Sequence, residues 1–314
     1  MALPLSVSFG PARRARPRGD RVFSGATRAA GLVVVLGLAG VAVFLTVQGI
    51  PALSAPGSAL GGHASFAAYV WPLVFGTVLA SVLALGMATP LALGTALVIS
   101  HYAPRRVAAM LGYVVDLLAA IPSVVYGLWG IGFLSGRLVP AYAWLSTHVG
   151  WLPFFAGPVS ATGRTILTAA IVLSLMVLPI ITAISREVFA QAPRLHQEAA
   201  LALGATRWEA IRMAVLPYAR SGVVSAVMLG LGRALGETMA VAMVLSASGV
   251  VTFDLVGTTN PSTIAANIAL NFPEATGLGV NALVASGLVL FVLTFVVNLA
   301  ARAIVARSMR KEQG

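Results

Sequence analysis

Residues Thr165–Ser185 have the sequence TILTAAIVLSLMVLPIITAIS, which contains no charged side chain. A helix that crosses the hydrocarbon core of a bilayer needs about 20 consecutive, mostly apolar residues, so this stretch alone can span a membrane. Comparable stretches recur, and the six predicted spans lie at Ala29–Pro51, within Phe66–Ser100, within Val107–Leu134, at Thr165–Ser185, within Ser221–Ser246 and within Leu278–Ala301. The sequence thus predicts an all-α, multi-pass membrane protein with six transmembrane helices.

The composition of the whole chain agrees with this class of protein. Of its 314 residues, 59% are hydrophobic and only 9% are charged, whereas a soluble domain has roughly 25% charged residues. The chain has no cysteine, which excludes disulfides, thiolate nucleophiles and metal–thiolate sites. The histidines do not pair at a metal-ligand spacing; they are His63, His101, His148 and His196. We therefore expect that the chain itself binds no metal and no cofactor.

The net charge of +11 comes mainly from arginine, and its distribution predicts an orientation. Basic residues gather before the first span, between the second and third, between the fourth and fifth, and after the sixth, whereas the other connections carry only Arg137 and Arg164. By the positive-inside rule both termini are cytoplasmic, so topology, rather than nucleic-acid binding, explains the charge. We expect a disordered basic tail at residues 1–20, a transmembrane domain at residues 21–305 and a cytoplasmic tail at residues 306–314.

The connection of residues 186–218 is the longest charged segment, and its sequence favours two short helices. Pro193 suits the first turn of a helix and Gly204 the position just past its end, which predicts one helix over Arg194–Leu203. Thr206 and Glu209 have the spacing of a capping box, so a second helix follows and is predicted to end at Pro217. From these residues alone, the segment is either a linker that lies on the membrane or a docking surface.

The same segment resembles the EAA loop of the ABC importer permease family. The residues that carry the resemblance are Glu198, Ala199, Ala200, Gly204, Leu216 and Pro217. Ala214 departs from the family, which more often has isoleucine there. The resemblance implies a coupling helix that sits in a groove of a separate ATPase subunit, the helix-in-groove mode of recognition. Because the single lysine, Lys311, is followed by Glu312, the chain has no P-loop; we expect ATP to be bound and hydrolysed by that partner, not by this non-catalytic chain.

Three ionisable residues fall inside predicted spans, where charge is costly and usually functional or paired. Arg233 and Glu237 are four residues apart in the fifth span, which predicts that they meet on one helical face, and Asp116 lies in the third. Arg233 and Glu237 are either a structural ion pair or part of a substrate path in which the guanidinium binds an oxyanion. For Asp116, a structural hydrogen-bonded acid and a role in the path are equal alternatives.

The sequence around these charges resembles one branch of the importer family. The segments are GRALGET at Gly232–Thr238, AIPSVVYG at Ala120–Gly127 and GDRVF at Gly19–Phe23, and they are similar to the PstC-type permeases of phosphate-specific ABC importers in the bacterial inner membrane. The resemblance implies phosphate as substrate, a PstA-like second permease, a PstB-like ATPase dimer and a PstS-like binding protein. The alternatives are a permease for another oxyanion, which Arg233 would suit equally, and an ion-coupled secondary transporter, against which the EAA loop argues.

The predicted outer connections carry aromatic residues and turns but no specific site. Trp144 and Trp151 lie between the third and fourth predicted spans. Their position is typical of the aromatic belt at a membrane–water interface. In the segment Val251–Thr276, the pair Asn260-Pro261 predicts a turn, with a short helix after it. Either connection is a candidate surface for a substrate-binding protein.

Overall fold

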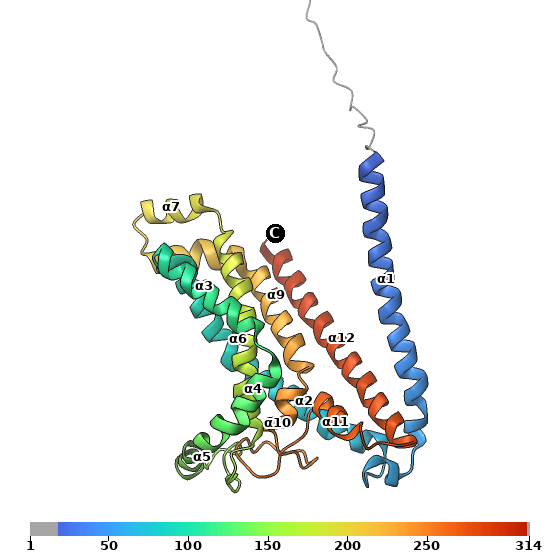
Figure 1. The fold of residues 1–314 in the computed structure, drawn as a ribbon. Helices are drawn as coiled ribbons and strands as arrows, with labels where there is room; N and C mark the ends of the chain where they lie inside the picture. Colours follow the sequence, from blue (N-terminus) through green and yellow to red (C-terminus); the bar gives the residue numbers. More distant parts are fainter. Residues whose placement is uncertain (1–17, 313–314) are drawn as a thin grey trace, which may run out of the picture. The chain divides into compact units, whose positions relative to one another are not determined.

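The computed structural model describes residues 18–312 and is almost entirely helical (Figure 1). The five longest helices are α1 (Arg18–Gly49), α2 (Phe66–Leu97), α6 (Ile166–Ala190), α9 (Leu216–Leu235) and α12 (Leu278–Glu312). The shorter helices are α3 (Arg105–Ala120), α4 (Ser123–Trp129), α5 (Ser135–Val149), α7 (Arg194–Ala202), α8 (Arg207–Ala210), α10 (Met239–Val244) and α11 (Ile264–Asn271). Two 3-10 turns, η1 (Ile50–Ser54) and η2 (Gly57–Leu60), and three π-helical segments, η3 (Val98–Tyr102), η4 (Gly130–Leu134) and η5 (Ile211–Val215), complete the helical elements.

The predicted number of membrane spans is confirmed. Among the described residues, six helical segments are long and apolar enough to cross a membrane: Val22–Ser54, Phe66–Tyr102, Ser123–Val149, Ile166–Ala190, Arg207–Leu235 and Leu278–Ala303. Most of the predicted basic tail lies outside the described residues. The orientation of the spans stays a prediction from the distribution of the arginines.

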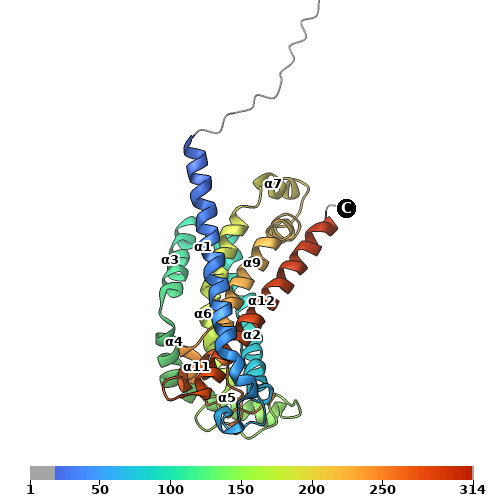
Figure 2. The ribbon, with the colours of Figure 1, turned by 90° about the vertical axis from the view of Figure 1, so that its right-hand side faces the viewer.

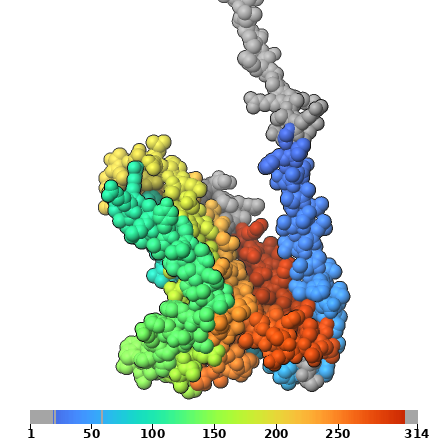
Figure 3. Space-filling model, in the orientation of Figure 1, coloured from blue at the N-terminus to red at the C-terminus, as the bar shows by residue number. Residues whose placement is uncertain are grey.

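The third span lies further along the chain than the sequence predicts. Helix α3 ends at Ala120, and Ile121 is extended, with φ −65° and ψ 129°. The cause is Pro122, whose ring disfavours a helical conformation for the residue before it. A continuous span within Val107–Leu134 is therefore wrong, and the span runs instead through α4, η4 and α5. Figure 3 shows the concave outline at this bend, where α3 meets α4 and α5.

The chain divides after Val47 into two units. The first contains most of α1, whose apolar side chains occur on every face of the helix, as expected of a helix surrounded by lipid. The second contains the remaining helices. Within it, α7 and the C-terminal end of α12 lie at one end, the predicted cytoplasmic end, and α5 and α11 lie at the other (Figures 1 and 2).

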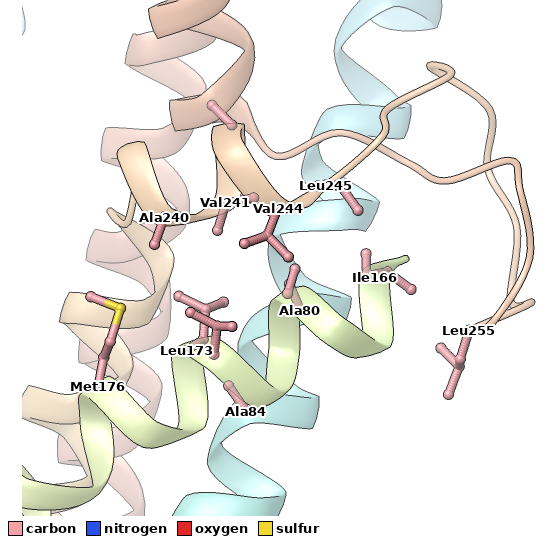
Figure 4. Close-up of a cluster of buried hydrophobic side chains, with 13 residues drawn as sticks. Ala80, Ala84, Ile166, Leu173, Met176, Ala240, Val241, Val244, Leu245 and Leu255 are labelled. Atoms are coloured by element: carbon pink, nitrogen blue, oxygen red, sulfur yellow. The ribbon is translucent and has the colours of Figure 1, made fainter. Parts of the chain in front are cut away.

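The core of the second unit is built on α2 and α6. Small residues at every fourth position of α2 form a buried stripe that lets α6 approach closely; they are Ala80, Ala84, Ala88, Ala92 and Ala96. The short helix α10 closes this core, with Val241 and Val244 directed towards Leu173 of α6 (Figure 4). Since α10 follows α9 directly, this packing fixes the segment that contains Arg233 and Glu237.

Candidate functional site

The fifth predicted span is interrupted between Arg233 and Glu237. Helix α9 ends at Leu235 and α10 begins at Met239, so the two charged residues do not share one helical face and that prediction is wrong. Gly236 forms the turn, and the Glu237 Oε1 accepts a hydrogen bond from the Ala240 N–H at 3.1 Å. A carboxylate is favourable there because the first N–H groups of a helix lack partners within the helix. The start of α10 thus engages the carboxylate that was predicted to pair with Arg233.

Arg233 faces a large cavity between α6, α9 and α12. The cavity has a volume of about 830 Å³, and its walls are formed by Ile180, Val224, Ser225, Met228, Leu229, Gly232, Arg233, Asn298, Ala301 and Arg302. Among the side chains that the structure describes, the ion pairs involve Arg186 and not Arg233. A guanidinium that is always charged and lacks a carboxylate partner has its donors available to an oxyanion.

The structure brings together the two segments that the sequence singled out. A Cβ added at Gly127 of α4 would lie 3.0 Å from the Ala240 Cα and 2.9 Å from the Met243 Sδ of α10. Only a glycine therefore allows α4 and α10 to pack this closely. Helix α4, which contains most of residues 120–127, therefore packs against α10, which directly follows residues 232–238.

Asp116 is not part of this site. It lies in α3 outside the six candidate spans, and its Oδ1 is 3.5 Å from the Arg186 Nη2 of α6. About half of the Asp116 side chain is exposed, and the residue does not line the cavity of Arg233. The observed partner fits the structural alternative, because the pair joins α3 to α6.

Arg164, just before α6, holds the end of α10 that lies opposite Glu237. The Arg164 Nη2 donates hydrogen bonds to the Met243 carbonyl at 3.1 Å and to the Leu245 carbonyl at 3.5 Å. The last carbonyls of a helix favour a cation, as its first N–H groups favour an anion. In the sequence, Arg164 is only a minor exception in the charge distribution. Its role could not be predicted, because its acceptors lie about 80 positions further along the chain.

Asn260 is a second residue whose role the sequence did not reveal. It is completely buried. Its Oδ1 accepts a hydrogen bond from the Ile166 N–H at 2.9 Å, and its Nδ2 donates to the carbonyls of Ser246 at 3.2 Å and Arg164 at 3.4 Å. The predicted turn at this position is therefore a junction that ties the start of α6 to the chain that leaves α10.

Asp254 lies in the loop that runs from the end of α10 to α11. Its Oδ1 accepts a hydrogen bond from the Val256 N–H at 3.2 Å. Burial raises the pKa of the Asp254 carboxyl, and the backbone hydrogen bonds from Val256 and Gly257 oppose this shift.

The predicted coupling loop has the expected local structure. Helix α7 contains Glu198, Ala199 and Ala200, and Gly204 follows it with φ +87°, a conformation that favours glycine. The capping box of α8 is present: the Thr206 N–H donates to the Glu209 Oε2 at 2.7 Å, and the Glu209 N–H to the Thr206 Oγ1 at 3.3 Å.

Two leucines near the ends of α7 are largely exposed. Leu195 is 78% exposed and Leu203 is 90% exposed. A cavity of about 750 Å³ separates α7 from the start of α9 and is lined by His196, Ala199, Ala200, Leu203, Gly204, Ala205, Glu209, Met213, Ala214 and Tyr218. Leu203 is thus both exposed and part of the lining of this cavity.

The end predicted for the second loop helix is wrong. Pro217 lies in the first turn of α9, and the chain passes from α8 into α9 through the π-helical segment η5. A proline is tolerated there because it directly follows the π-helical segment η5, where the regular i→i−4 hydrogen bonds are already interrupted. Leu216 and Pro217 therefore begin α9, the helix that ends near Arg233, so the coupling loop is directly continuous with it.

Comparisons with solved structures support the fold. The methionine ABC transporter MetNI in an inward-facing conformation matches with a TM-score of 0.51 and 17% identity, over 76% of this chain and 93% of that chain. A bacterial ABC transporter that imports the acidic polysaccharide alginate matches with a TM-score of 0.52 and 19% identity, over 91% of this chain and 99% of that chain. At this identity the likeness concerns the fold alone.

Comparisons of sequence are closer. The chain is 49% identical to the phosphate transport system permease protein PstC 2 of Mycobacterium tuberculosis, over 96% of this chain and 94% of the relative. It is 45% identical to the corresponding PstC of Mycobacterium leprae, over 91% and 93%. Residues 88–310 match the family model for the inner membrane component of binding-protein-dependent transport systems. Such a component is a non-catalytic subunit that works with others, and this chain belongs to that family of inner membrane transport components.

Proposed function

We propose that this chain forms part of the translocation path of an ATP-driven phosphate importer in the bacterial inner membrane. The relatives at 45–49% identity are named phosphate transport system permeases, and the site has a group suited to phosphate. The observation that carries the proposal is Arg233, a permanent cation that faces a cavity of about 830 Å³ and has no ion-pair partner among the described side chains.

The chemistry of Arg233 favours a tetrahedral oxyanion as cargo. Two parallel N–H donors of a guanidinium match two oxygens of phosphate, and such charge-assisted bonds are roughly twice as strong as neutral ones. A site for transport must also release the anion, so binding at Arg233 must be of moderate strength. Glu237 supports the site indirectly in this proposal, because its carboxylate accepts a hydrogen bond from the Ala240 N–H and so fixes the chain directly after Arg233.

In this proposal, the ATP hydrolysis that drives transport takes place on another chain. Helix α7 docks in a groove of a PstB-like ATPase dimer, which binds and hydrolyses ATP. The exposed Leu195 and Leu203 and the hollow beside α7 support this contact. Since α8 continues through η5 into α9, a displacement of the loop would be transmitted towards Arg233 along this helical path.

The proposed assembly has two further subunits. A PstA-like permease completes the path. The wall of α9 around Gly232 is available to it, because a Cβ at Gly232 would meet no atom of this chain within 4 Å. A PstS-like protein delivers phosphate to the outer loops. Asp116 has a supporting role in this proposal, through the ion pair that joins α3 to α6.

Uptake of radiolabelled phosphate tests the proposal in cells whose only phosphate importer contains this chain. Arg233→Lys should lower uptake per assembled complex by roughly tenfold or more, because an ammonium keeps the charge but not the bidentate geometry. Arg106→Lys is the matched control, since Arg106 is an exposed arginine of α3 outside the cavity. Normal uptake by Arg233→Lys would contradict a path through this guanidinium.

Two further measurements separate phosphate import from the alternatives. Excess sulfate or molybdate should not compete with labelled phosphate, whereas equal competition would mean a general oxyanion permease. Depletion of ATP should stop uptake while the membrane potential is maintained. Uptake that instead follows the ion gradient would indicate a secondary transporter.

A further inference from the structure

The cavity of Arg233 contains a second arginine, which the proposed function does not use. Arg302 lies on α12, and Asn298 lies one turn before it on the same face of that helix. Ser225 of α9 lines the same cavity. Two guanidinium groups, an amide and a hydroxyl thus share one space, and the described residues that line it include no aspartate or glutamate.

These groups are spread along the cavity rather than gathered at one point. Arg233 is in the last turn of α9, close to α10, whereas Ser225 is eight residues earlier, about 12 Å along the helix axis. Arg302 is in the C-terminal third of α12, towards the end that shares one side of the unit with α7 (Figures 1 and 2). The polar groups therefore lead from Arg233 towards the predicted cytoplasmic end.

The positive-inside rule explains why an arginine lies at this end of a span. It does not explain why the arginine lines the cavity. Arg105 and Arg106 satisfy the rule on α3, where they are exposed away from the cavity. Arg302 is exposed too, but it lines the cavity beside Asn298. Two cations in one cavity with low-dielectric walls focus a positive potential there, and an anion relieves the repulsion between them.

We propose that Arg302, assisted by Asn298 and Ser225, forms a second binding station for the tetrahedral oxyanion, on the cytoplasmic side of Arg233. The inference rests on the proposed function, because it concerns the same anion in the same cavity. Conduction is efficient when several sites of moderate strength replace one strong site. Arg302 would receive the anion that Arg233 releases and hold it near the exit.

The first test measures phosphate uptake per assembled complex. Arg302→Gln should lower uptake by roughly tenfold, the effect of losing one charge-assisted hydrogen bond to the anion, and Arg302→Lys should recover part of it. Arg106→Gln removes an arginine from the same membrane side and should leave uptake unchanged. Uptake by Arg302→Gln equal to that of Arg106→Gln would overturn the station.

The second test detects the anion directly and does not depend on transport. Because the chain has no cysteine, Val224→Cys introduces a unique thiol in this subunit, at a position that lines the cavity beside Ser225 and leaves Arg302 in place; Arg106→Cys provides the control. In the purified, nucleotide-free importer, inorganic phosphate should slow the modification of residue 224 several-fold, and an anionic methanethiosulfonate should outpace a cationic one there. Neither effect should occur at residue 106, and adding Arg302→Gln should abolish the protection at residue 224. Protection that is absent, or that persists undiminished without Arg302, would refute the inference.

The two proposals can fail separately. If Arg233→Lys stops uptake but protection at residue 224 does not depend on Arg302, the anion uses Arg233 alone and only the second station is wrong. If Arg233→Lys transports normally, the proposed path fails. Phosphate protection at residue 224 that depends on Arg302 would then still show an anion site in the cavity.

Discussion

Replacing Asn260 with alanine should loosen the loop that joins α10 to α11. The Ile166 N–H is buried and would lose its acceptor at 2.9 Å, which costs about 1–3 kcal/mol. The longer bonds from Nδ2, to the Ser246 carbonyl at 3.2 Å and the Arg164 carbonyl at 3.4 Å, add about 1 kcal/mol. A total of about 2–4 kcal/mol would raise the population of the open loop by about 30-fold to about 700-fold.

Thiol labelling measures this opening. Ser262 is 5% exposed and lies two residues after Asn260, so a cysteine at residue 262 reacts with an impermeant reagent only when the loop opens. When closing is fast, the labelling rate follows the open population. Asn271→Ala is the matched control, because the Asn271 side chain is exposed and bonds only within α11. Labelling of the Asn260→Ala variant within a few-fold of this control would refute the calculation.

Three other changes test separate parts of the structure. Gly127→Leu should force α4 away from α10 and reduce phosphate uptake, whereas Gly132→Ala, which meets no neighbour within 4 Å, should not. Gly204→Val should strain a backbone with φ +87° by about 1–2 kcal/mol and lower transport-coupled ATP hydrolysis, whereas Gly204→Asn, which tolerates this conformation, should retain it. Because burial raises the pKa of Asp254 in the folded protein, the ionised carboxylate disfavours folding and stability is lost as pH rises through that pKa. Asp254→Asn should therefore melt higher than the parent at about pH 7, and the difference should shrink towards about pH 3; an advantage that persists in acid would contradict this.

Local sequence rules predicted the local structure well. The capping box at Thr206 and Glu209 and the turn at Gly204 are both present, because each depends on residues within one helical turn. The number of spans was also predictable, since it follows from the lengths of apolar runs.

The ends of the helices inside those runs were not predictable in the same way. The third and fifth predicted spans are interrupted at Pro122 and Gly236, yet apolar residues resume within a few positions of both breaks. A helix in lipid needs no polar face, so the hydrophobic pattern gives no sign of where one helix ends and the next begins. Contacts between distant residues were equally hidden. Asp116 and Arg186 are 70 residues apart, and Asn260 and Ile166 are 94 apart.

The break after α9 also bears on the two interpretations of Arg233 and Glu237. A structural ion pair requires the carboxylate and the guanidinium to satisfy each other, since a charge left alone at bilayer depth is costly. In this fold Glu237 is bound at the start of α10, and Arg233 faces a cavity instead. Removing Arg233 therefore leaves no newly unpaired carboxylate, so Arg233→Leu should assemble normally and fail only in transport. A cation that is not required for assembly but is kept in a cavity within the membrane needs water or a bound anion to stabilise it, and this requirement favours the substrate path.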